Sequence, residues 1–107
     1  MAVVSFSAPG MAEDFVYNES VDLKVGESLI LKGVRGRECE DSAPAWSRLA
    51  DRFPSSDLGT LSDGGAGFTD SGRCKGRVAA RGIKFTATKP GTETLEIYND
   101  EIRITVN

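Results

Sequence analysis

The chain has 107 residues, 39% of them hydrophobic, and its 13 basic and 16 acidic side chains leave a formal net charge of -3. This length provides one domain with a single two-layer core. No apolar run approaches the length of a membrane span, and an acidic total argues against nucleic-acid binding, which requires a basic face. We therefore expect one domain that binds neither a membrane nor nucleic acid.

The first 19 residues are expected to form an N-terminal arm (residues 1–19) ahead of a domain that spans residues 20–107. The apolar residues up to Phe6 suit a short edge strand, and Pro9-Gly10 suits a turn. Such an arm is either a frayed terminus or a strand donated to a neighbouring molecule, which makes Phe6 a candidate contact residue. The arm shows no signal peptide. Either the chain does not follow the secretory route, or Met1 replaces a signal that has been removed.

Two alternating segments open the domain. Residues 21–25 and 28–32 alternate apolar and polar side chains, and Gly26-Glu27 separates them. This period of two indicates strands, and the short separation predicts a turn after which the chain returns as a second strand. Residues 33–41 follow as a charged loop.

One segment carries a helical pattern, over residues 44–53. Ser42 suits an N-cap, Pro44 suits the first turn, and Pro54 ends the helix. The apolar side chains fall on one stripe of such a helix, at spacings of three and four residues: Trp46, Leu49, Ala50 and Phe53. The pattern predicts a short helix of two to three turns.

A glycine-rich segment lies near the middle of the chain. Residues 58–62 suit a short strand, and residues 63–76 (DGGAGFTDSGRCKG) are expected to form a long loop. A connection of this length in a compact domain is either functional or poorly ordered. Asp63 and Asp70 offer the oxygen ligands that calcium prefers. A glycine-rich turn is the simpler interpretation, and we expect no metal site.

Three short strands with tight turns between them are predicted over residues 83–88, 93–98 and 101–106. Apolar side chains alternate there with Lys, Thr, Glu or Arg, as in antiparallel strands with one face in a core and the other in water. The side chains expected to point into the core are Ile83, Phe85, Ala87, Leu95, Ile97, Ile102, Ile104 and Val106. The pattern predicts an all-β fold.

Two cysteines and the absence of histidine limit the chemistry. A structural zinc site needs more Cys or His ligands, and no Ser-His or Cys-His nucleophile can form. Glu38, Glu40 and Asp41 read as a solvated charge run rather than a catalytic carboxylate pair. We expect a non-enzymatic protein without a cofactor. A disulfide between Cys39 and Cys74, expected outside the cytosol, would close about 36 residues and stabilise the fold by roughly 3–4 kcal/mol.

The segment around Cys74 is basic, with the side chains Arg73, Lys75, Arg77 and Arg81. One interpretation is a contact patch for an acidic partner surface. The alternative is charge balance within one molecule, in which the disulfide brings this segment close to the acidic run around Cys39. Tyr98 lies on the polar face of its strand and is a candidate for an exposed aromatic contact. Trp46, on the helix stripe, suits the core.

Four motifs together resemble the bacterial immunoglobulin-like domains. They are the V-G-E turn and strand of residues 25–31, Trp46 followed by serine, the apolar strand of residues 58–62, and the K-P-G-T turn within residues 85–95. The resemblance covers residues 20–107 and implies an immunoglobulin-like antiparallel β-sandwich, here with one short inserted helix at about residues 44–53. Domains of that family are mostly non-catalytic modules of surface proteins, adhesins and phage virions.

The resemblance implies a structural or display module that acts through protein–protein contacts, in a virion or at the cell surface. Its partner would be a capsid or tail protein, or another copy of the chain bound through the N-terminal arm. A second resemblance, to the chagasin-type inhibitors of cysteine proteases, rests on the glycine-rich run of residues 64–67 ahead of strands that end at Tyr98. It implies a binding or protease-inhibitor protein that uses a glycine-rich loop over residues 63–82.

Overall fold

The computed structural model describes residues 13–107. Phe6 and most of the predicted arm lie outside these residues. The described part of the chain contains seven strands and one short helical segment. The strands are β1 (Glu13–Asp14), β2 (Ser20–Leu23), β3 (Ser28–Arg35), β4 (Gly59–Ser71), β5 (Gly76–Ala87), β6 (Gly91–Ile97) and β7 (Asp100–Val106), and the helical segment joins α1 (Trp46–Leu49) to the 3-10 helix η1 (Ala50–Arg52).

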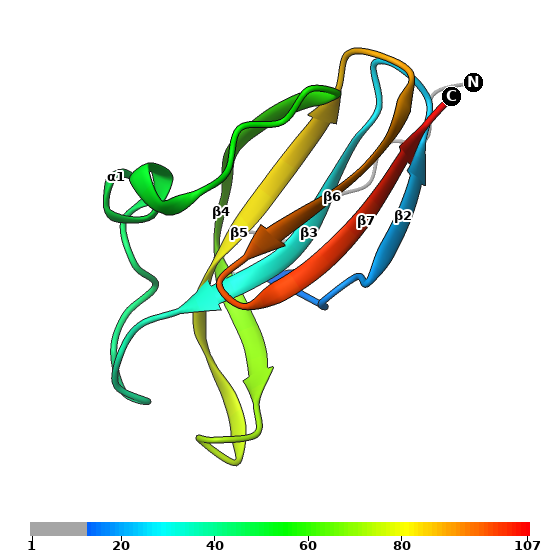
Figure 1. Cartoon of the computed structure of the whole chain (residues 1–107). Coiled ribbons are helices and arrows are strands. Elements are labelled where there is room, and N and C mark those ends of the chain that lie inside the picture. The colour runs from blue at the N-terminus through cyan, green and yellow to red at the C-terminus, as the bar shows by residue number, and fades with distance from the viewer. Residues whose placement is uncertain (1–12) are drawn as a thin grey trace, which may run out of the picture.

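The strands form two sheets that pack face to face (Figure 1). One sheet has the strand order β1-β4-β5-β3, and the other has the order β2-β7-β6. The prediction of an all-β fold with one short helix is confirmed. The pairs β3–β5, β4–β5 and β6–β7 are antiparallel, but β1–β4 and β2–β7 are parallel. The sandwich is therefore mixed, which corrects the expectation of purely antiparallel strands.

Two turns carry the chain from one sheet to the other instead of joining paired strands. The turn after β2 leads to β3, and the turn after β5 leads to β6. At the first of them Gly26 has a φ of 94°, which favours glycine, and its N–H donates to the Ala87 carbonyl at 2.8 Å. Because the chain crosses over here, β2 lies beside the C-terminal strand and not beside β3.

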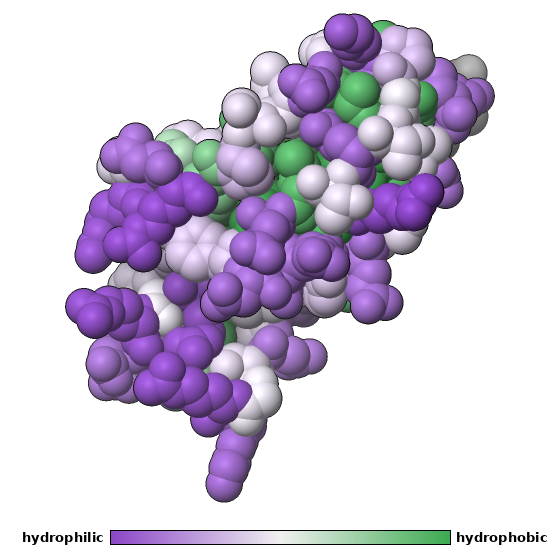
Figure 2. Space-filling view, in the orientation of Figure 1, coloured by the Kyte–Doolittle hydropathy of each residue, from purple (hydrophilic) through white to green (hydrophobic). Residues whose placement is uncertain are grey.

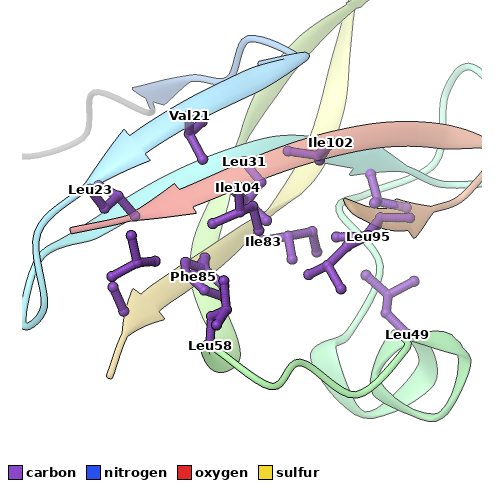
Figure 3. Packing of buried hydrophobic residues seen from close by; sticks show 14 residues of the cluster. Val21, Leu23, Leu31, Leu49, Leu58, Ile83, Phe85, Leu95, Ile102 and Ile104 are labelled. Atoms are coloured by element: carbon purple, nitrogen blue, oxygen red, sulfur yellow. The ribbon is translucent and has the colours of Figure 1, made fainter. Parts of the chain in front are cut away.

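The space between the sheets holds the main hydrophobic core (Figure 3). All eight side chains predicted to point inward from the last three strands are buried, with at most 4% exposed. They pack in one cluster with Val21 and Leu23 of β2 and Leu31 of β3. The alternation of apolar and polar residues therefore predicted this core correctly, and its apolar burial is the main stabilising contribution.

The helical segment is shorter than the predicted range of residues 44–53. Ala45 takes the N-cap position without a side-chain hydrogen bond, so Ser42 does not cap the helix. Phe53 ends the segment in extended conformation, as expected before proline. Leu49 is buried in the main core, and Trp46 and Phe53 pack against that core with their ring centroids 5.3 Å apart. The predicted apolar stripe thus faces inward.

The glycine-rich segment forms ordered strands, so the predicted long loop over residues 63–82 is wrong. Residues 63–71 lie in β4 and residues 76–82 lie in β5, and only residues 72–75 turn between them. A bulge between Asp63 and Ala66 interrupts the pairing. Glycine at several strand positions removes the side chains whose alternation would have revealed the strands. The resulting hairpin projects beyond the sandwich (Figure 1).

Residues 13–19, which we call the strap, cross the four-stranded sheet from β4 to β3. The Phe15 N–H donates to the Phe68 carbonyl of β4 at 2.7 Å. The Asn18 N–H donates to the Leu31 carbonyl of β3 at 3.0 Å. These bonds tie the strap to both sides of the sheet, and the Phe15 side chain between them is only 5% exposed.

Three glycines, one from each of β3, β4 and β5, make room for the ring of Phe15. We call Gly33, Gly67 and Gly82 the glycine trough. A Cβ atom at Gly82 would lie 2.8 Å from two atoms of the ring, closer than real Cβ contacts. Gly82 has the opposite parity along β5 to Phe85, so the ring lies on the sheet face turned away from the main core. The strap therefore closes a second, smaller core on the outside of this sheet.

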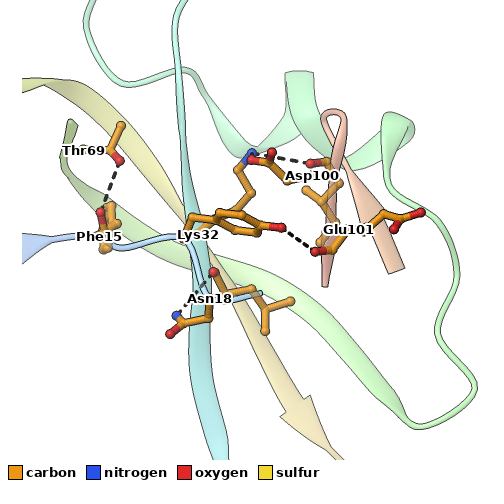
Figure 4. A network of polar contacts seen from close by, with 9 residues as sticks. Phe15, Asn18, Lys32, Thr69, Asp100 and Glu101 are labelled. Atoms are coloured by element: carbon orange, nitrogen blue, oxygen red, sulfur yellow. Dashed lines mark hydrogen bonds and ion pairs between the residues drawn. The ribbon is translucent and has the colours of Figure 1, made fainter. Parts of the chain in front are cut away.

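Polar contacts tie the strap and β3 to the three-stranded sheet (Figure 4). The Lys32 side chain of β3 is buried, and its Nζ lies 2.5 Å from Oδ2 of Asp100. The Tyr17 hydroxyl of the strap donates to the Glu101 carbonyl of β7 at 2.6 Å. The pKa of the Tyr17 hydroxyl is raised, mainly because the group is partly buried and then because carboxylates lie nearby, that of Asp100 having the larger effect among them.

Candidate functional site

A disulfide joins the loop that follows β3 to the tip of the β4–β5 hairpin. Cys39 and Cys74 are bonded, with their Cα atoms 5.6 Å apart, which confirms the predicted pair. The loop is also tied internally, because the Glu38 N–H donates to Oδ2 of Asp41 at 3.0 Å. A disulfide is compatible with an extracellular location. Over residues 13–107, no helix has both the length and the apolar character to cross a bilayer.

The predicted basic segment does not form one patch. Arg77 pairs with Asp14 of β1 at 2.7 Å, and its guanidinium lies 3.9 Å from the centre of the Phe68 ring. Arg81 pairs with Asp63 at 3.2 Å. Arg77 therefore links β5 to β1, on the far side of β4, and Arg81 links β5 to its neighbour β4.

The other members of the predicted contact set lie elsewhere. Lys75 occupies the hairpin turn with a φ of 56°, and Arg73 faces a hollow beside β3. Within residues 13–107 neither forms an ion pair with the acidic run around Cys39. The disulfide does bring Arg73 and Glu38 to the lining of the same hollow. Tyr98 is half-buried in the β6–β7 turn, where its ring meets Phe53 edge to face at 5.8 Å. It is therefore less exposed than its strand pattern predicted.

Two adjoining hollows lie beside the disulfide-tied loop, with volumes of about 670 and 490 Å³. They share the lining residues Val34, Arg35, Gly36, Arg37 and Tyr98. We call the pair the arginine groove, because five arginines line it: Arg35, Arg37, Arg48, Arg52 and Arg73. Figure 2 shows hydrophilic side chains gathered over α1 and the neighbouring loop.

These arginines come from four places in the chain: β3, the loop that follows it and carries Arg37, the helical segment, and the tip of the β4–β5 hairpin. Arg35 ends β3, and its guanidinium donates to the Gly36 carbonyl at 2.9 Å. Arg48 and Arg52 lie four residues apart on the helical segment, so they share one side of it while Leu49 faces the core. Arg73 reaches the groove from the hairpin tip, next to the disulfide.

The groove is strongly positive in a protein with a negative total charge. Its lining contains six basic side chains, the five arginines and Lys32, against two acidic ones, Glu38 and Asp41. Lys32 is neutralised by Asp100. None of the five arginines forms an ion pair with a carboxylate in the described part of the chain. Such a cluster of cations attracts anions.

The groove suits binding better than acid–base chemistry. Guanidinium groups stay protonated and act only as donors. Of the two aspartates considered for calcium, Asp63 and Asp70, the first is already engaged, since its Oδ1 accepts a hydrogen bond from the Gly65 N–H at 2.8 Å and pairs with Arg81. Residues 13–107 contain no group of three or more Cys, Asp or Glu side chains arranged to hold a metal ion.

Sequence reasoning missed the arginine groove because its members are spread over nearly forty positions. The only local signals were the spacing of Arg48 and Arg52 and the position of Arg37 and Arg73 near the two cysteines.

Comparisons with protein-family models, with curated proteins and with solved structures find no match to this chain. The resemblance to bacterial immunoglobulin-like domains therefore remains a prediction.

Proposed function

We propose that this protein is a non-enzymatic structural or display module of immunoglobulin-like type that acts through protein–protein contacts. The observation that carries the proposal is the concentration, at one disulfide-tied end of a β-sandwich, of five arginines that have no carboxylate partner within residues 13–107. An ordinary solvated surface intersperses charges of both signs. A patch in which basic side chains outnumber acidic ones six to two is typical of a surface that meets a complementary partner.

The setting proposed for this module is a virion or a cell surface. The disulfide supports an oxidising environment, and the four motifs that resemble bacterial immunoglobulin-like domains support a surface or particle protein. The partner is then a capsid or tail protein, or another copy of the chain that binds through the N-terminal arm.

Fractionation of the source material tests this proposal. The protein is expected to copurify with particles or with the cell envelope, and cross-linking there is expected to join it to a defined protein partner. A truncation tests the arm, and it should remove residues 1–12 only, because Phe15 and the rest of the strap belong to the fold. A protein found free and without cross-linked partners in every fraction would contradict the proposal.

A protease inhibitor is the second candidate, favoured by the projecting β4–β5 hairpin whose tip is fixed by the disulfide (Figure 1). A rigid, exposed tip is the form in which inhibitors enter a protease cleft, because a fixed shape reduces the entropy lost on binding. The test is a panel of cysteine proteases, with a variant in which residues 72–75 are replaced. Inhibition that the replacement abolishes would support this candidate, and no inhibition of any protease would exclude it.

A further inference from the structure

We infer that the arginine groove binds an extended, acidic peptide segment of the partner protein. This inference rests on the proposed function and names the chemistry of the partner. Its first support is the balance of charge, because the five arginines have no carboxylate partner in the described chain and an acidic segment would supply it.

The type of cation supports a carboxylate ligand. The groove contains arginine at every unpaired basic position of its lining, and its one lysine is already paired with Asp100. The planar guanidinium presents parallel N–H donors that match the two oxygens of a carboxylate. Repeated use of arginine therefore indicates contacts of defined geometry rather than a diffuse positive field.

The groove is also held in shape before any ligand arrives. Arg35 is fixed by donation to the Gly36 carbonyl at 2.9 Å. The loop around the groove is fixed by Arg81, which donates to the Pro44 carbonyl at 2.9 Å, and by the disulfide at Cys39. A site that is already ordered loses less entropy on binding.

The shape of the groove favours a chain over a small anion. Two hollows that share a wall make a longer site than one carboxylate needs. The lining also includes the small apolar side chains of Ala43, Pro44 and Ala45, which are not buried. An extended peptide that alternates acidic and apolar side chains would satisfy both kinds of lining.

Nucleic acid fits the groove less well than an acidic peptide. Single-stranded nucleic acid is held by exposed aromatic rings on which bases stack. The groove has one aromatic side chain, Tyr98, and its ring is occupied by the contact with Phe53.

The test measures binding of a rhodamine-labelled peptide of alternating glutamate and leucine by fluorescence anisotropy. The full chain is compared with the triple variant Arg37→Gln, Arg48→Gln, Arg52→Gln. We expect the triple variant to bind about tenfold more weakly, and raised salt to weaken the unmodified chain. Arg103→Gln is the matched control, because Arg103 is exposed on β7 and does not line the groove. It should bind as the unmodified chain does.

A second measurement uses the disulfide. Reduction should release the loop that carries Arg37 from the hairpin tip that carries Arg73, and so weaken peptide binding several-fold. Circular dichroism of the reduced protein checks that the sheets persist, since the disulfide lies outside the main core.

Three outcomes would overturn the inference. They are no binding of the acidic peptide, equal binding by the triple variant, and stronger binding of a DNA oligonucleotide or of polyphosphate than of the peptide. The proposed function is judged separately, by whether the triple variant still copurifies with particles or envelope. If it does, and the peptide does not bind, the module is retained but this groove is not its contact surface.

Discussion

The two cores of this protein are built in opposite ways. The main core, between the sheets, is filled by large apolar side chains that alternate along each strand, such as Phe85 and Ile104. The outer core, under the strap, is made by removing side chains, because glycines from three strands form the trough that receives Phe15. The first therefore leaves a clear pattern in the sequence, and the second leaves only glycines that resemble those of a loop.

Both cores depend on close packing, but opposite kinds of substitution disrupt them. In the main core, loss of a large side chain leaves a cavity. In the outer core, a gain of one methyl group at a glycine is enough to displace the ring. Of the four predictions that follow, the first three compare the two cores by these changes, and the fourth concerns a polar contact of the strap.

The largest effect is expected in the main core. Phe85 is fully buried, so Phe85→Ala should lower the free energy of unfolding by about 4 kcal/mol. Urea unfolding followed by tryptophan fluorescence of Trp46 measures the change. A loss below about 1 kcal/mol would show that this core is not the principal source of stability.

Phe15→Ala should cost less, about 3 kcal/mol, because the ring fills a trough on one sheet rather than the space between two. Hydrogen exchange should show faster exchange at the Phe15 and Asn18 amides, which bond to the sheet. Exchange at β6 and β7 should change little, since the strap is not part of the main core. Uniformly faster exchange across both sheets would instead make the two cores one cooperative unit.

Gly82→Ala tests the trough itself. The added Cβ would lie 2.8 Å from the Phe15 ring, so we expect a loss of about 2 kcal/mol. Gly76→Ala is the matched control on the same strand, because a Cβ there would meet nothing within 4 Å.

A double-mutant cycle sharpens this test. The three atoms nearest the new Cβ all belong to Phe15. In a Phe15→Ala background, Gly82→Ala should therefore become nearly neutral. An unchanged cost in that background would assign the effect to backbone conformation and not to the ring.

The smallest effect is expected at Tyr17, which is 40% exposed. Tyr17→Phe removes the hydroxyl that donates to the Glu101 carbonyl and should lower stability slightly. The pKa of this hydroxyl is raised in the folded state, so its contribution is fully present below the ordinary tyrosine value of about 10 and is lost as pH rises through the folded value. The difference in Tm between the two proteins should disappear in that alkaline range.

The sequence predicted the parts of the fold that repeat a simple pattern. The inward faces of β5, β6 and β7, the helical stripe around Leu49 and the Cys39–Cys74 pair were all readable, because each depends on spacing within one segment or on the only two cysteines. The exchange of sheets at Gly26 was not readable, since a tight turn gives the same local signal whether it joins paired strands or crosses between sheets.

The candidate site was harder to predict than the fold. Arg77 and Arg81 looked free in the sequence because their partners, Asp14 and Asp63, are distant from them along the chain. Arg48 and Arg73 looked unrelated because only the three-dimensional arrangement places both beside β3. Surface sites assembled from several elements leave no periodic trace, so their charges can be counted in the sequence but not located.

The parallel pairing of β2 with β7 has a mechanical consequence. These are the first strand after the strap and the last strand of the chain, and bonds from Arg103 N–H to the Glu19 carbonyl and from Asn107 N–H to the Leu23 carbonyl extend the pair at both ends. A pull applied along the chain on either side of the pair would slide the two strands in opposite directions. All of their hydrogen bonds would then bear the force together in shear, rather than opening one after another, so the module should resist stretching along this axis.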